Sequence, residues 1–328
     1  MKAAVRDRYG PPEVVRVEEI DRPEPTADQV LVRVGAASVN RADLDGLYPR
    51  WQFTRLFTGL RRPKVARLGL DVAGVVEAVG PDAGAFMPGD AVFGDLSTSR
   101  LGQGAFAEFV CERETMFSAM PPALSFEDAA TLPHAAILAL QGLRRRDGRM
   151  VEAGDRVLIE GASGNVGPFA VQVAKARGAE VTGVCSPAKV EFVRSLGADH
   201  VIDYRSVDYT RAPKRYDWIC AVDAHHPLLA SRRALARSGT FVALGGPSSW
   251  MLSSIVVTPA IALATDQSAG MMIWWKPFAP DDVTTLKALI ADGSVRPRID
   301  RRFPLDEIVA ALRYVDEGRA MGKVVVTP

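Results

Sequence analysis

Short apolar runs separated by turn signals characterise the first part of the chain. The runs are rich in valine and proline-rich segments lie between them, a combination that predicts strands. Pro88-Gly89-Asp90 is a typical turn signal between two of these runs. The predicted strands are Val14–Ile20, Gln29–Ala37, Ala73–Gly80, Ala91–Gly94 and Ala105–Val110. This pattern favours a β-rich domain.

The pattern changes near Ser125, where helical and extended stretches begin to alternate. Each predicted strand is apolar throughout rather than at every second position, which indicates strands covered on both faces, as in a parallel sheet. The predicted strands are Arg156–Ala162, Glu180–Cys185, His200–Tyr204, Asp217–Asp223, Thr240–Gly245 and Met271–Trp275. The predicted helices are Val166–Gly178, Lys189–Gly197 and Leu228–Ser238.

The C-terminal part returns to mixed structure, with a helix predicted over Asp281–Asp292 and a last strand over Lys323–Thr327. This order predicts an α/β protein in which a doubly wound parallel sheet of the Rossmann type is inserted into a β-rich domain. We place the β-rich domain at residues 1–122 and 278–328, and the Rossmann domain at residues 123–277.

The composition is that of an ordinary globular protein, because the 328 residues are 48% hydrophobic and 24% charged. The net charge of +1 gives no overall attraction to nucleic acid. Cys111, Cys185 and Cys220 are far apart and odd in number, so we expect neither a disulfide framework nor a zinc knuckle. The N-terminal stretch MKAAVRDRYG lacks the apolar core of a signal peptide. We therefore expect a cytoplasmic protein.

The stretch IEGASGNVGPF, Ile159–Phe169, runs from a predicted strand through a glycine turn into a helix. Backbone N–H groups and the helix dipole make such a turn a site for phosphates. Gly164 would let the backbone approach a pyrophosphate, and Gly167 would let the helix pack close to the strand. The candidate cofactor residues here are Ser163, Gly164, Asn165, Val166 and Gly167, together with Gly245 after a later strand. The alternative is a glycine turn used only for packing.

Ser186 and Lys189 follow the second predicted strand of this domain. A site for NAD usually has Asp or Glu at this strand end. A hydroxyl and an ammonium would bind the 2′-phosphate of NADPH, which a carboxylate would repel. Tyr204, after the next strand, would add a third donor. Hydrogen bonds to charged groups contribute about 1.5–3 kcal/mol each, so we predict NADPH as the cofactor. The alternative for Lys189 is a solvated residue in a first helical turn.

The chain resembles the medium-chain dehydrogenase/reductase superfamily, and within it the zinc-free quinone oxidoreductase branch, which is zeta-crystallin-like. The motifs that carry the resemblance are SVNRADL (Ser38–Leu44), LGLDVAGVVEAVG (Leu68–Gly80), PGDAVFG (Pro88–Gly94), GASGNVG (Gly161–Gly167), SLGADHVIDY (Ser195–Tyr204) and GKVVV (Gly322–Val326). The resemblance implies a GroES-like substrate domain and a Rossmann domain with a cleft between them. It also implies a homodimer formed through an edge strand near Met271–Trp275.

Zinc-using relatives have a cysteine where this chain has Asn40, and a His-Glu pair where it has Leu70 and Asp71. The third ligand position falls near His134. Leucine cannot ligate a metal, and a catalytic zinc needs three protein ligands and an open position. The four-cysteine cluster of a structural zinc is missing as well. We therefore predict no metal site.

Without a metal, the favoured reaction is hydride transfer to a quinone or an α,β-unsaturated carbonyl, and the candidate catalytic residues are Asn40, Tyr48 and His134. The alternative for His134 is a buried histidine without a catalytic role, and for Tyr48 an ordinary surface aromatic. Relatives have a threonine that helps to hold the nicotinamide where this chain has Leu138. A non-catalytic NADPH-binding sensor or adaptor is therefore an alternative function. An enoyl-thioester reductase, from a related enzyme class, is a further alternative.

Two further segments have open interpretations. Phe53, Leu56, Phe57 and Leu60 lie at helical spacing within residues 49–67, among arginines. Such an amphipathic helix would form a lid over the substrate site or contact a membrane surface. His225-His226 follows the strand that ends at Asp223, and we predict a surface loop there.

Overall fold

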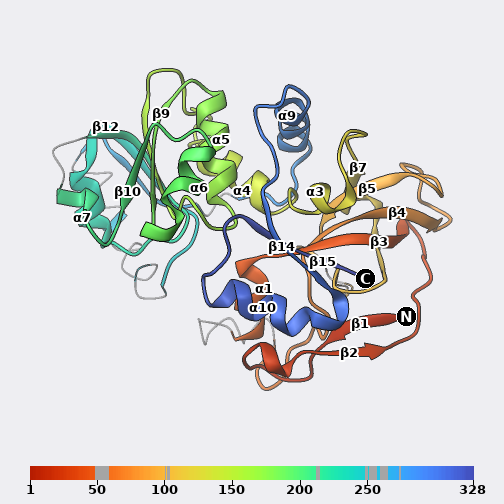
Figure 1. Ribbon diagram of the computed structural model, residues 1–328. Helices are drawn as coiled ribbons and strands as arrows, with labels where there is room; N and C mark the ends of the chain where they lie inside the picture. The colour runs from red at the N-terminus through yellow and green to blue at the C-terminus, as the bar shows by residue number, and fades with distance from the viewer. Residues whose placement is uncertain are drawn as a thin grey trace. The chain divides into compact units, whose positions relative to one another are not determined.

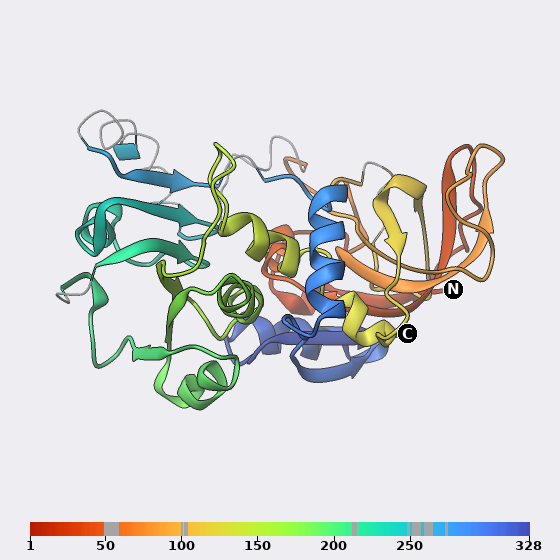
Figure 2. The same cartoon turned by 90° about the horizontal axis from the view of Figure 1, so that it is seen from above.

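The computed structural model describes residues 1–48, 59–99, 101, 104–211, 215–247, 250, 257–258, 265–272 and 275–328. The chain forms two compact units, each described below by itself. Unit 1 consists of Met1–Ala135, Pro277–Val283 and Pro297–Pro328, and unit 2 of Ala136–Lys276 and Thr284–Arg296. The fold is α/β, as predicted, with a β-rich unit and a parallel-sheet Rossmann unit (Figures 1 and 2).

Unit 1 is built on a seven-stranded sheet in the order β14-β15-β3-β4-β5-β7, with β6 paired to β3. All its neighbouring strands are antiparallel except β14 and β15. A separate two-stranded sheet joins β1 and β2. The strands are β1 (Lys2–Val5), β2 (Arg16–Glu19), β3 (Gln29–Val39), β4 (Asp71–Val79), β5 (Ala91–Asp95), β6 (Phe109–Arg113), β7 (Phe117–Ala119), β14 (Ile299–Pro304) and β15 (Lys323–Thr327).

The helices of unit 1 are α1 (Arg41–Leu47), α3 (Phe126–Ala130) and α10 (Ile308–Asp316). Helix α10 buries Ile308, Ala311, Leu312 and Val315, whose spacing of three and four residues places them on one face. These side chains join the strand valines in one hydrophobic core. Short 3₁₀ turns occupy Pro12–Val14, Glu114–Met116 and Leu305–Glu307.

Two strand predictions in unit 1 were misplaced. The run Ala105–Val110 does not form one strand, because Ala105 and Phe106 are buried in a loop and β6 begins only at Phe109. The run Val14–Ile20 begins in a 3₁₀ turn, so β2 is shorter than predicted. In both places the residues are apolar but do not belong to a regular strand. Hydrophobicity alone does not distinguish such residues from a buried strand.

Unit 2 contains a six-stranded sheet in the order β10-β9-β8-β11-β12-β13, and every neighbouring pair is parallel. The order reverses between β8 and β11, which is the switch point of a doubly wound sheet, where ligands bind. The strands are β8 (Arg156–Glu160), β9 (Glu180–Cys185), β10 (His200–Asp203), β11 (Tyr216–Ala221), β12 (Leu235–Ala243) and β13 (Ser268–Met271). Val157, Leu158 and Ile159 of β8 are fully buried, as expected for a strand covered on both faces.

The other helices are α4 (Ala135–Gly142), α5 (Gly167–Ala176), α6 (Val190–Ser195), α7 (Leu228–Arg233) and α9 (Pro280–Ala291). Gln141 in α4 anchors the end of unit 2, because its side-chain amide accepts from the backbone N–H of Lys276 at 3.0 Å and donates to the Lys276 carbonyl at 2.8 Å. The amide thus pairs with the backbone as a strand neighbour would.

Three boundary predictions in unit 2 were wrong. The helix predicted over Leu228–Ser238 ends at Arg233, because the chain pairs with β11 from Leu235 onwards. The last strand covers Ser268–Met271 rather than Met271–Trp275, since its register with β12 begins at Ser268. Helix α6 begins at Val190, after a 3₁₀ turn over Pro187–Lys189.

Candidate functional site

The glycine turn of unit 2 combines a left-handed glycine, a close helix contact and an open backbone position. Gly161 follows β8 with φ +80°, in the left-handed region that favours glycine. A Cβ on Gly167 would lie 2.2 Å from the carbonyl oxygen of Gly161, so only glycine lets α5 pack this close to the turn. A Cβ on Gly164 would meet only that same oxygen, at 3.7 Å. The backbone at Gly164 is therefore open to a phosphate.

The predicted donors for a 2′-phosphate lie at the carboxyl ends of β9 and β10. Ser186 follows β9 directly, and the N–H of Tyr204 donates to the carbonyl of Cys185 at 3.2 Å. The backbone of Tyr204 thus lies beside the end of β9, next to Ser186, and the Tyr204 side chain is exposed. Burial, reinforced by Asp203, raises the pKa of the Cys185 thiol to about 11, while the charge of Lys189 opposes the rise. Lys189 therefore lies near this strand end as well.

The remaining cofactor candidates surround the same edge of the sheet. Ser163 and Val166 are buried within the glycine turn, and Asn165 lies between them. The carbonyl of Gly245, just after β12, accepts from the N–H of Ala224 at 2.9 Å. The loops after β11 and β12 are thereby held together.

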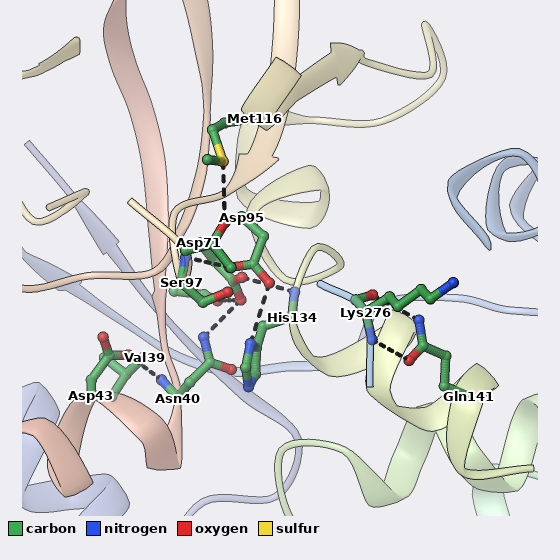
Figure 3. Close-up of polar contacts among 12 residues, drawn as sticks. Val39, Asn40, Asp43, Asp71, Asp95, Ser97, Met116, His134, Gln141 and Lys276 are labelled. Carbon is green, nitrogen blue, oxygen red and sulfur yellow. Dashed lines mark hydrogen bonds and ion pairs between the residues drawn. The ribbon is translucent and has the colours of Figure 1, made fainter. Parts of the chain in front are cut away.

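Asn40, Asp71 and His134 meet in a buried polar cluster of unit 1 (Figure 3). The Nδ2 of Asn40 donates to Oδ2 of Asp71 at 2.8 Å, and the backbone N–H of His134 donates to Oδ1 of Asp71 at 2.8 Å. The Oγ of Ser38 also donates to Oδ2 of Asp71, at 2.8 Å. Asp71 is thus fully buried and bonded through both oxygens.

Lys323 completes this cluster, and the sequence analysis did not identify it. Its Nζ lies 2.6 Å from Oδ1 of Asn40 and 3.3 Å from Oδ2 of Asp71, and the side chain is fully buried. Burial lowers the pKa of Lys323, and the charge of Asp71 opposes this shift. The signal for it was a charged residue at the head of the apolar run GKVVV.

A second pair of the cluster joins His134 to Asp95, the last residue of β5. The imidazole Nδ1 lies 3.3 Å from Oδ2 of Asp95, and the other oxygen of Asp95 accepts from the N–H of Ser97 at 2.7 Å. Burial acts to lower the pKa of His134, but the hydrogen bond and charge of Asp95 outweigh it and raise that pKa. Burial acts to raise the pKa of Asp95, and the contact with His134 outweighs it in turn. The contact between the two groups therefore favours the protonated imidazole and the ionised carboxylate.

The sheet register explains why these residues meet. Ser38 in β3 lies opposite Asp71 in β4, and Asp71 lies opposite Asp95 in β5. Two like charges directly opposite each other would be destabilising, but Lys323 lies against Asp71 and His134 against Asp95.

Asp43 in α1 borders the cluster and was also not identified from the sequence. Its carboxylate accepts from the backbone N–H of Asn40 at 2.7 Å and of Gly69 at 3.2 Å. Burial, with the negative charge of Asp71, raises the pKa of Asp43 to about 7, although the bond from Asn40 opposes the shift. This carboxyl group therefore titrates near neutral pH.

Other predicted residues lie outside these contacts. Tyr48 ends α1 and its ring packs against the core of unit 1, and Leu138 is a partly buried residue of α4. The amphipathic helix predicted within residues 49–67 falls largely outside the described residues. From Gly59 to Arg67 the chain is not helical, and Leu60 is 65% exposed.

In the part of the chain that the structure describes, no group of three or more His, Cys, Asp or Glu residues is arranged to hold a metal ion. Among those same residues, no helix combines the length and apolar character needed to cross a bilayer.

Two family models of known proteins match parts of this chain. Residues 26–122 match the family model of the alcohol dehydrogenase GroES-like domain, and residues 196–326 match that of the zinc-binding dehydrogenase. The prediction of a GroES-like domain is thereby confirmed.

Two curated relatives span almost the whole chain. The mouse (Mus musculus) mitochondrial NAD(P)H oxidoreductase RTN4IP1 is 34% identical over 361 residues, which cover 99% of this chain and 89% of the relative. The chloroplastic NADPH-dependent alkenal/one oxidoreductase of Arabidopsis thaliana is 32% identical over 337 residues, covering 100% and 80%. Among solved structures, the quinone oxidoreductase from Coxiella burnetii has a TM-score of 0.86 at 29% identity and covers 100% of this chain and 99% of its own.

Proposed function

We propose, on the premise that this chain belongs to the medium-chain dehydrogenase/reductase superfamily, in its quinone oxidoreductase-like branch, that it is an NADPH-dependent, zinc-independent reductase. The hydride acceptor is a small apolar quinone or α,β-unsaturated carbonyl. The bound nicotinamide would supply the hydride, and the protein would align the acceptor and stabilise the charge that develops on its oxygen.

The observation that carries this proposal is the set of partners of Asp71. An amide, a hydroxyl and the ammonium of Lys323 surround its carboxylate. These groups favour a hydrogen-bonded cluster over a catalytic zinc, which needs three protein ligands. A reductase built this way favours conjugated acceptors, because conjugation spreads the negative charge that a Lewis acid would otherwise stabilise.

The choice of NADPH rests on the strand ends of unit 2. Ser186, Lys189 and Tyr204 gather at the carboxyl ends of β9 and β10. A 2′-phosphate there would accept hydrogen bonds from a hydroxyl and an ammonium, which are strong because the acceptor is charged.

Of the catalytic candidates, His134 is the one whose ring contacts a carboxylate. Asp95 raises the pKa of the imidazole and so favours its protonated form, from which His134 would donate the proton that completes the reduction. Asn40 is buried and its amide oxygen accepts from Lys323. Its role is therefore to orient Asp71 and the backbone of the cluster. Tyr48 remains a candidate contact for the acceptor.

We also propose a homodimer that forms through β13. This strand is the last in the described order of the unit 2 sheet and pairs only with β12 among the described residues. An edge of this kind is a ready template for a second copy. Light scattering in solution tests the proposal, since a monomer at micromolar concentration would contradict it.

A panel of acceptors tests the proposed activity. NADPH oxidation would be followed with quinones, enones, enoyl thioesters and unconjugated aldehydes. Turnover of quinones or enones, without aldehydes, supports the proposal. Faster turnover of enoyl thioesters would identify an enoyl-thioester reductase instead. Binding of NADPH without turnover of any acceptor would favour a sensor or adaptor.

A further inference from the structure

A buried carboxylate lies directly before the glycine turn. Glu160 is the last residue of β8, and its side chain is only 7% exposed. The hydroxyl of Tyr209 donates to its Oε2 at 3.1 Å, and the Nδ1 of His226 lies 3.1 Å from its Oε1. A negative charge is therefore held next to the backbone where the cofactor phosphates would bind.

His226 was expected on a surface loop, but it is packed against this carboxylate. Its second ring nitrogen, Nε2, lies 3.5 Å from Oδ1 of Asp208, and its ring meets that of Tyr209 edge-on at 4.8 Å between centroids. Both nitrogens thus face carboxylates. A neutral imidazole has one N–H, whereas an imidazolium has two and can donate to both.

Three loops of the carboxyl edge meet at this imidazole. His226 follows β11, Glu160 ends β8, and Asp208 and Tyr209 follow β10. The hydroxyl of Tyr209 also lies 3.1 Å from that of Ser231 in α7.

We propose that His226 couples binding of the dinucleotide to the uptake of a proton, an inference that rests on the proposed cofactor site. Phosphates placed at the turn add negative charge near Glu160 and Asp208. The imidazolium compensates that charge and the neutral ring does not, so the bound state favours protonated His226. Because linkage is reciprocal, the dinucleotide binds more tightly when His226 is already protonated.

The groups that face His226 favour this behaviour. The hydrogen bond of Glu160 raises the pKa of His226, burial lowers it, and the charges of Glu160 and Asp208 raise it further. His225, on the same loop, opposes the rise. The ring of His225 itself is exposed and lies 3.1 Å from Asp223.

This arrangement fixes the sign of the pH dependence. Affinity is greatest below the pKa of His226 and falls as pH rises through it. A shift of about one pKa unit on binding corresponds to about a tenfold loss of affinity across the titration. The structure also supplies a matched control, because His225 is an adjacent, exposed histidine whose Nε2 lies 3.1 Å from Oδ2 of Asp223.

Calorimetric titration of NADP⁺ between pH 6 and pH 9, in two buffers of different ionisation enthalpy, tests the coupling. Wild type and His225→Gln should take up a fraction of a proton and lose affinity roughly three- to tenfold as pH rises. His226→Gln and Glu160→Gln should lose that part of the dependence. Titration of the 2′-phosphate itself is common to all four proteins and cancels in the comparison.

The outcomes separate the coupling from the cofactor site. If His226→Gln and Glu160→Gln bind NADP⁺ with the proton uptake of the wild type, the coupling is refuted while the cofactor site stands. If the wild type binds no dinucleotide at any pH, the cofactor site is refuted and the coupling with it. Circular dichroism of the two variants verifies that they are folded, and either variant alone suffices for the comparison.

Discussion

The ammonium of Lys323 lies 2.6 Å from the side-chain oxygen of Asn40, and this contact fixes the direction of the Asn40 amide. With the oxygen facing Lys323, the amide nitrogen faces Asp71 and donates to it at 2.8 Å. The contact exists because β15 and β3 are antiparallel and Val324 lies opposite Val39. Lys323, which precedes Val324, therefore lies beside Asn40, which follows Val39. A lysine near the C-terminus thus orders a side chain near the N-terminus.

Replacing Lys323 by methionine should destabilise the protein. The change leaves the carboxylate of Asp71 buried without its cation, and breaking a buried pair in this way costs about 3–5 kcal/mol. Denaturant unfolding of Lys323→Met measures the loss. The double variant Lys323→Met/Asp71→Asn should recover part of it, because the uncompensated charge is gone. A double variant less stable than Lys323→Met would show that the charge pair is not what stabilises the cluster.

Cofactor preference should depend on Ser186 and Lys189. Ser186→Asp places a carboxylate where the 2′-phosphate would bind, and it should weaken NADPH roughly 10- to 100-fold, at about 1.4 kcal/mol per factor of ten. NADH should be affected far less. Fluorescence titration of both cofactors measures the change. Ser195→Asp, the same substitution at an exposed serine that ends α6, should leave both affinities unaltered. Equal affinities of the wild type for NADPH and NADH would overturn the assignment.

Elemental analysis of protein purified without chelator should find no stoichiometric zinc. The reason is chemical, since Leu70 cannot ligate a metal and Asp71 is already bonded to Ser38 and Asn40. Chelators should therefore leave NADPH oxidation unchanged. One zinc per subunit would show that the cluster rearranges to bind it.

The fold was predictable because its signals are local. Parallel strands buried on both faces are apolar throughout, so the pattern around Val157–Ile159 identified the Rossmann unit. The glycine turn was equally local, since Gly161 and Gly167 are required by backbone geometry within a few residues. Strand ends were less accurate where buried residues such as Phe106 fill the core without belonging to a regular strand.

The polar cluster was only partly predictable, because its partners are set by the register between distant strands. Asn40 and His134 were found by resemblance to metal ligand positions. Asp95 carries no local signal of its role, and the charge of Lys323 before an apolar run does not reveal its partners, since each residue acquires them only when β5 and β15 take their places in the sheet. His226 was missed for the same reason, as its partner Glu160 lies 66 residues away in the chain.

Stability should fall as pH rises from about 4 to 7, in part because of Asp43. Its folded pKa of about 7 lies above its ordinary value of 3.8, so the folded state binds a proton that the unfolded state has lost, and deprotonation costs stability. At about 1.4 kcal/mol per unit the contribution is about 4 kcal/mol. The unfolding free energy of the wild type minus that of Asp43→Asn should therefore fall by about this amount across the window. Asp45→Asn, an exposed change on the same helix, should show no such trend, and a constant difference for Asp43→Asn would contradict the assignment.

The charge of His134 should appear in the pH profile of turnover. If the imidazolium donates the proton, kcat with an enone stays high below the pKa of His134 and falls above it. Asp95→Asn removes the hydrogen bond and the charge that raise this pKa, so the falling limb should move to lower pH. His134→Gln should lower kcat about 10²–10³-fold, the loss typical of a donor to a developing oxyanion, while NADPH affinity changes little. Asp82→Asn, an exposed change in the same unit, should reproduce the wild-type profile. If Asp95→Asn leaves the limb where it was, the group that titrates in turnover is not His134, and the proton comes from another donor or from water.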